Sequence, residues 1–137
     1  MLHDSRRSGV PAVAANLIIA LDKTKIAPTV LFAYDGDYVQ ALRQNNIDTQ
    51  VFDKRRPLIW RLNRFLFHVR LLKLAKQMDV VHVHSIKLAF SVLIAKWLGA
   101  RVVYHLHELP GKIGPLLRKA IEMADCVVFC SKTCEAH

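Results

Sequence analysis

The 137-residue sequence has few cysteines, few acidic residues and no long apolar segment. Its three cysteines, Cys126, Cys130 and Cys134, are crowded near one end, and an odd number in so short a stretch provides no disulfide framework. No apolar run approaches the ~20 residues of a membrane-spanning helix. Met1 and Leu2 are followed at once by polar residues, unlike a signal peptide. We therefore expect a cytoplasmic protein.

The shortage of acidic residues gives the chain a strong positive charge. It has 20 Lys and Arg against 11 Asp and Glu, for a net charge of +9. Such a balance favours an anionic partner, which could be a phosphate-bearing ligand, a nucleic acid or an anionic membrane surface. Apolar residues make up 53% of the chain, so a single domain with a real core is expected.

Short apolar segments alternate with helical segments along the chain. We expect strands at 30–34, 48–52, 79–84, 101–107 and 126–130, and helices at 10–21, 38–44, 58–78, 86–98 and 116–124. Continuous Val-rich strands are typical of parallel strands buried on both faces. The pattern predicts an α/β fold with a doubly wound, Rossmann-like parallel sheet. Only Met1-Leu2-His3 precede the first helix, so we expect its first strand to be truncated.

A lone glycine marks the start of the first expected helix, in Ser8-Gly9-Val10. Glycine lets a backbone approach a ligand closely, and a helix N-terminus favours a phosphate. The segment is either a phosphate-contacting turn or a simple strand-to-helix turn. The dinucleotide fingerprint GxGxxG is absent.

Two His-x-His pairs lie at the ends of two consecutive expected strands. Strand alternation puts His82 and His84 on one face, and likewise His105 and His107. We expect His82 and His105 to be satisfied core residues, whereas His84 and His107 stand at strand ends and are the better candidates for a ligand cleft. A histidine-based metal hydrolase remains a weaker alternative, because no carboxylate accompanies both pairs.

The segment from Lys54 to Met78 is basic and carries two apolar stripes. It has eight basic residues and no acidic one. One stripe suffices to dock a helix on its sheet, so something else must cover the other. An anionic membrane or a protein partner would do so, and so would burial in the core by a neighbouring helix or a missing domain. The stripe and basic residues assigned to that outer face are Arg55, Arg56, Trp60, Arg64, Phe67, Leu71 and Leu74. Stronger sedimentation with anionic than with neutral liposomes would support peripheral membrane binding.

The order of motifs resembles family 4 glycosyltransferases of the GT-B fold. A glycine turn and helix, 4–10, are followed by 79–85 (DVVHVHS) and by 95–99 (AKWLG). A strand closing on a histidine motif, 102–108, and an Ala-Asp-x-Val-Val-x-x-Ser stretch, 124–131, complete the series. Each motif alone is weak, and their order over nearly the whole chain is moderately specific.

The resemblance implies an enzyme that transfers a sugar from a nucleotide-sugar with retention of stereochemistry, without a bound metal or other cofactor. It implies that Ser8, Gly9 and Val10 form a donor-side loop, although Ser8 stands where the family usually has a first glycine. It implies a catalytic role for His107 beside the transferred sugar. Plausible acceptor-side neighbours are His84, Ser85 and Glu108. Acceptors in the family include cell-envelope glycan and lipid-linked precursors, and nucleic acid is not expected.

The family's second domain, which holds the nucleotide and a paired-Glu motif, has no counterpart in these residues. We therefore expect 1–137 to form the N-terminal, acceptor-side domain and to be inactive alone. The alternative is a non-enzymatic α/β module with a basic membrane- or nucleic-acid-binding face, which a salt-dependent affinity for DNA or RNA would support.

Overall fold

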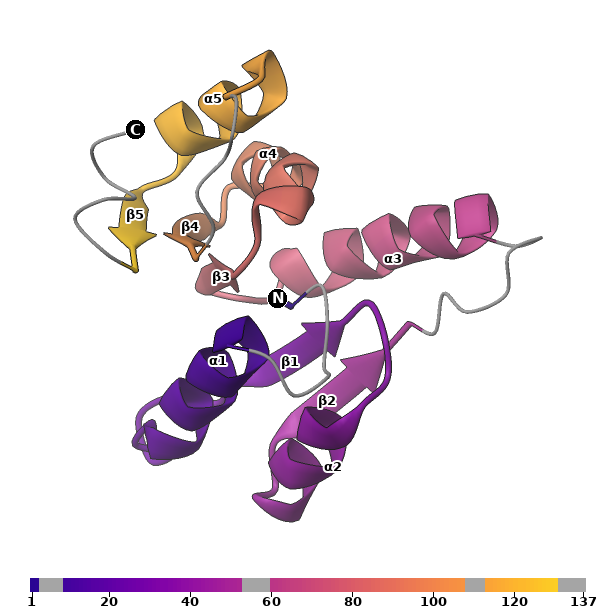
Figure 1. The fold of residues 1–137 in the computed structure, drawn as a ribbon, viewed down its shortest axis with the longest axis vertical. Helices are drawn as coiled ribbons and strands as arrows, with labels where there is room; N and C mark the ends of the chain where they lie inside the picture. The colour runs from indigo at the N-terminus through magenta and orange to yellow at the C-terminus, as the bar shows by residue number, and fades with distance from the viewer. Residues whose placement is uncertain (3–8, 53–59, 108–112, 131–137) are drawn as a thin grey trace. The chain divides into compact units, whose positions relative to one another are not determined.

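The chain is described by a computed structural model covering residues 1–2, 9–52, 60–107 and 113–130, with the side chains of 60–64 left out. It divides into two compact units, Met1–Phe65 and Leu66–His137. The boundary falls inside helix α3 (Trp60–Ala75). All the described strand pairs are parallel, which confirms the expected α/β class (Figure 1).

The first unit contains a two-stranded parallel sheet. Its elements are α1 (Gly9–Ala20), β1 (Thr29–Phe32), α2 (Asp37–Gln44) and β2 (Asp48–Val51). Leu2 adds a parallel bridge to Phe32. Its amide donates to the carbonyl of Leu31 at 3.0 Å, and the amide of Ala33 donates to the Leu2 carbonyl at 3.1 Å. One residue, Leu2, thus pairs with β1 on the side away from β2.

An apolar cluster forms the core of the described part of this unit. Phe32 is its largest member and is fully buried. Val39 and Leu42, three residues apart on α2, both point into it, whereas the residues between them remain partly or fully exposed. The remaining buried members are Leu2, Ala14, Ala15, Val30 and Ile47. Hydrophobic burial is therefore what holds β1, α1 and α2 together.

The second unit contains a three-stranded parallel sheet in the order β3-β4-β5. Its elements after α3 are β3 (Val80–Val83), the 3₁₀ turn η2 (Ile86–Leu88), α4 (Ala89–Trp97), β4 (Arg101–Leu106), α5 (Pro115–Met123) and β5 (Cys126–Phe129). The helix expected over 86–98 is corrected at its start, where the chain forms a 3₁₀ turn. Ser85 caps that turn, its hydroxyl accepting from the amide of Lys87 at 3.2 Å.

Gly99 ends α4 in the left-handed conformation, with φ of 84°. Its amide donates to the carbonyl of Lys96 at 2.9 Å, and the amide of Ala100 donates to that of Ala95 at 3.1 Å. These two bonds form a Schellman cap, which directs the chain from α4 into β4. The end of the helix expected over 86–98 is confirmed.

Asp125, just before β5, ties three elements of this unit together. Its carboxylate accepts two bonds from the ammonium of Lys96 on α4, at 2.8 and 2.9 Å. It also accepts from the amide of Val102 at the start of β4, at 2.6 Å, while its own amide donates to the Val102 carbonyl at 2.9 Å. These charged hydrogen bonds hold the pKa of Asp125 below its usual value.

Candidate functional site

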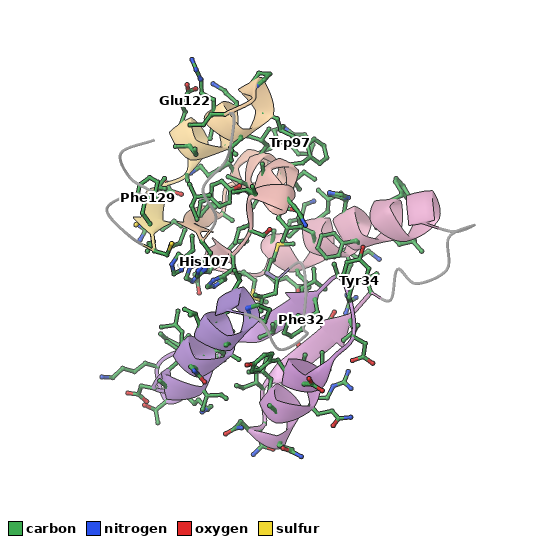
Figure 2. All side chains as sticks on the ribbon, viewed as in Figure 1. Phe32, Tyr34, Trp97, His107, Glu122 and Phe129 are labelled. Carbon is green, nitrogen blue, oxygen red and sulfur yellow. The ribbon has the colours of Figure 1, made fainter. Side chains whose placement is uncertain are left out.

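Four imidazoles come together at the carboxyl ends of β3 and β4. We call His82, His84, His105 and His107 the histidine cluster. Within each strand the two rings stack, with centroids 3.9 Å apart for His82 and His84 and 3.8 Å apart for His105 and His107. Between strands, Nδ1 of His84 lies 3.2 Å from Nε2 of His107. Figure 2 shows His107 amid this group of nitrogen-bearing side chains.

The register of the sheet explains why the two pairs meet. His82 on β3 lies opposite Val103 on β4, and Val83 lies opposite Tyr104. The next step of that register brings His84 beside His105. Because side chains alternate along a strand, all four imidazoles then project from the same face of the sheet.

The cluster is held in its neutral form. Burial, reinforced by the neighbouring imidazoles, lowers the pKa of His82 to about 4 and that of His107 to about 4. The same causes lower the pKa of His84, and burial lowers that of His105. At neutral pH each ring therefore has one protonated and one unprotonated nitrogen.

The contact between His84 and His107 requires complementary tautomers. One of the two facing nitrogens donates and the other accepts, since neither ring is charged. His84 is only 1% exposed, whereas His107 is half-buried. His84 can therefore orient the ring of His107, and His107 can offer its other nitrogen to a hydroxyl group that approaches from solvent.

The burial of the histidines corrects part of the sequence-based interpretation. His84, expected at a cleft, is the most deeply buried of the four. His82 and His105, expected in the core, are half-buried. Moreover, Nδ1 of His105 is shielded from solvent and has no hydrogen-bond partner within the described parts of the chain. His105 is thus not a satisfied core histidine.

The acceptor-side candidates around the cluster have different positions. Ser85 is buried, and its hydroxyl caps the turn after β3. Its carbonyl accepts from the hydroxyl of Tyr104 at 3.3 Å. Glu108 lies outside the described residues. Ser85 therefore has a structural role at the end of β3, and its contact with an acceptor stays a prediction.

Tyr104 is the residue of this site that the sequence analysis missed. It is fully buried in β4, and its hydroxyl bonds to the backbone where β3 ends. A tyrosine at a buried position of a Val-containing strand is a usable signal, because a buried phenol needs a partner. It fixes the ends of β3 and β4 relative to each other, beneath the histidines.

The donor-loop candidates lie in the first unit. Ser8 is outside the described residues, Gly9 is the exposed first residue of α1, and Val10 packs partly buried against the apolar core. A Cβ added to Gly9 would meet nothing within 4 Å. No acidic residue occupies the first turn of α1. Packing among the described residues therefore does not demand glycine here, and the helix N-terminus keeps its affinity for anions.

The apolar face assigned to a membrane or partner is wrong for two of its residues. Phe67 is fully buried and Leu71 is 2% exposed, because this stripe of α3 is the one that joins the core. Phe65, on the other stripe, is 63% exposed. Leu74 is half-buried. Arg55 and Arg56, with the side chains of Trp60 and Arg64, lie outside the described structure.

A search of the described helices finds none with the length and apolar character needed to cross a membrane. This agrees with the absence of a ~20-residue apolar run in the sequence.

Comparisons with solved structures give a clear match of fold. HepE of Anabaena, in complex with UDP and glucose, matches over 98% of this chain with a TM-score of 0.66 and 22% identity. The UDP-glucose complex of HepE gives the same TM-score and identity, and the complex with UDP gives 0.67 and 21%. This chain spans 39% of the HepE chain in the first of these structures. No curated protein matches this sequence.

At this level of identity the HepE structures establish a shared Rossmann-like fold. The family is established independently, because the sequence model of Glycosyltransferase Family 4 matches residues 7–137. That match includes all of the motifs on which the resemblance rested except the first residues of the glycine turn. The chain belongs to Glycosyltransferase Family 4.

Proposed function

We propose that this chain is the acceptor-side part of a retaining glycosyltransferase that takes its sugar from a nucleotide-sugar. The pairing of His84 with His107 at the ends of β3 and β4 is the observation that carries the proposal. The imidazole of His107 is neutral and oriented, and it lies at the carboxyl ends of parallel strands, where α/β folds bind ligands. Family membership and the UDP-glucose bound by the structurally similar HepE support a nucleotide-sugar as the donor.

In this proposal His107 contacts the transferred sugar or the acceptor hydroxyl, and His84 positions it. A neutral ring can accept a hydrogen bond from a sugar hydroxyl, or donate one to it, without a buried charge to desolvate. Gly9 and the N-terminus of α1 supply backbone amides for a donor phosphate, together with Ser8 and Val10. No metal or organic cofactor takes part in the transfer. The acceptor is a cell-envelope glycan or a lipid-linked precursor, and the enzyme works in the cytoplasm.

The chain alone is not expected to complete the reaction. In the HepE structures more than half of the polypeptide lies beyond the part that this chain matches. We propose that the nucleotide is held mainly by such a second domain, so that the 137 residues bind sugar weakly and do not turn it over.

Histidine side-chain NMR of the isotope-labelled chain tests this function. With a chelator present, UDP-glucose at millimolar concentration should shift the ring signals of His107 and His84 and leave His68 on α3 unchanged. His107→Gln should weaken the response, whereas His68→Gln should not. Shifts confined to His68, or none at all, would contradict the role of His107. Release of UDP by the chain alone would show that the 137 residues suffice for turnover.

A further inference from the structure

The histidine cluster also has the composition of a metal site. The ligand nitrogens of His82, His84 and His105 all lie within 4.8 Å of one another. Tetrahedral zinc, bound at ~2.0–2.1 Å, separates its ligand nitrogens by roughly 3.3 Å. The 3.2 Å between the facing nitrogens of His84 and His107 already has that value. The stacked rings must rotate from these positions for three nitrogens to converge on one ion.

The unsatisfied nitrogen of His105 gives an independent reason to look for a ligand. Its Nδ1 is shielded from solvent and makes no hydrogen bond to any described residue. An unpaired buried polar atom is costly, so such atoms in native proteins usually have a partner. A bound cation would use the electron pair of that nitrogen.

The donor set selects the class of metal. Each donor in the group is an imidazole, and no Asp or Glu among the described residues belongs to it. Calcium and magnesium require oxygen ligands, whereas imidazoles suit zinc, nickel and copper. Three histidines with water as the fourth ligand form a well-known zinc arrangement.

We propose that His82, His84 and His105 bind one Zn²⁺ ion, with water or His107 as the fourth ligand. The half-exposed rings of His82 and His105 leave a path for the ion, and the buried ring of His84 forms the floor of the site. Binding draws His84 away from its contact with His107 unless both rings bind the metal together. The zinc-bound form is therefore distinct from the metal-free form that the transferase proposal describes, and the evidence for the site is the geometry of its ligands.

Zinc titration of the tag-free chain tests the site. The substitutions His3→Gln, His137→Gln, Cys126→Ser, Cys130→Ser and Cys134→Ser remove the thiols and the two histidines outside the described residues, so that binding reports on the cluster. Calorimetry should give one Zn²⁺ per chain with a dissociation constant of about 1 μM or below. At a free concentration about 100-fold above that constant, zinc should raise the melting temperature by roughly 9 °C, and Mg²⁺ should not. A wild-type chain without stoichiometric zinc binding would overturn the proposal.

A matched pair of variants locates the site. His105→Gln removes a half-exposed ligand and should weaken zinc binding by at least about 100-fold, since even partners that only support a ligand contribute 10- to 100-fold. His68→Gln, on α3, should bind zinc like the wild type. Equal affinity of His105→Gln and wild type would refute the assignment. Histidine NMR of the wild type is the second readout if a variant fails to fold, because zinc must then shift His82, His84 and His105 and spare His68.

Discussion

The two units use the same parallel architecture and fill it with different chemistry. In the first, β1 packs an apolar cluster centred on Phe32, and the buried hydroxyl of Thr49 bonds to the carbonyl of Ile47 only two residues away. In the second, the ends of β3 and β4 carry the histidine cluster. The carboxylate of Asp125 joins α4 to β4 through Lys96 and Val102. We therefore expect the stability of the first unit to fall when apolar volume is lost from its core. The stability of the second unit should instead depend on histidine protonation and metal binding.

The largest effect is expected in the apolar unit, on Phe32→Ala. Phe32 is fully buried and lies in the strand that joins Leu2 on one side to β2 on the other. Its truncation leaves a cavity, and should lower the free energy of unfolding by about 3–5 kcal/mol in denaturant titrations. Hydrogen exchange should accelerate more in β1 and β2 than in β3 and β4.

Phe65→Ala is the control for this comparison. It removes the same side chain from a position that is 63% exposed, and should cost less than about 1 kcal/mol. Equal losses for the two variants, or unchanged exchange in β1 and β2 after Phe32→Ala, would show that the cluster around Phe32 is not what stabilises the first unit.

A smaller effect is expected in the second unit on acidification. The folded pKa values of His82 and His107 are about 4, below the ordinary value of 6.5. The unfolded chain therefore binds more protons between these values, and stability falls as the pH drops from 6.5 towards 4. Both rings are partly exposed, so solvent screening limits the loss to about 2 kcal/mol. Denaturant titrations from pH 7 to pH 4, with a chelator present, measure it.

The double variant His82→Gln, His107→Gln should reduce this pH dependence without abolishing it, because the pKa values of His84 and His105 are also lowered by burial. Phe32→Ala should keep the same pH profile at lower stability, because its cavity lies in a part of the chain whose described residues include no histidine. A pH profile unaffected by removal of the two histidines would show that other groups control acid sensitivity.

Much of this contrast could be predicted from the sequence, and part of it could not. The parallel strands and the helix stop at Gly99 follow from local signals, namely Val-rich segments and a glycine after an apolar helix. The meeting of His84 with His107 depends on the register between β3 and β4, which no local pattern specifies. The sequence likewise does not show which of the two apolar stripes on α3 is buried. In the structure it is the stripe that contains Phe67 and Leu71.

The smallest effect is expected at the helix caps, which occur in both units. Gly99 after α4 has φ of 84°, and Asn46 after α2 has φ of 57°. Around Asn46 the amide of Ile47 donates to the carbonyl of Leu42 at 3.1 Å, as Ala100 does to Ala95 in the second unit. Gly99→Ala should cost about 1 kcal/mol in denaturant titrations, because a Cβ disfavours the left-handed conformation.

The source of that cost can be isolated. A Cβ at Gly99 would meet no atom within 4 Å, so the loss comes from backbone strain and not from a clash. Gly99→Asn should therefore restore part of the stability lost in Gly99→Ala, since asparagine visits the left-handed region readily and already does so at Asn46. If asparagine is as destabilising as alanine, the second unit tolerates only glycine at its cap. The equivalence of the two caps would then be broken, because the turn into β4 would be under a constraint that the turn into β2 lacks.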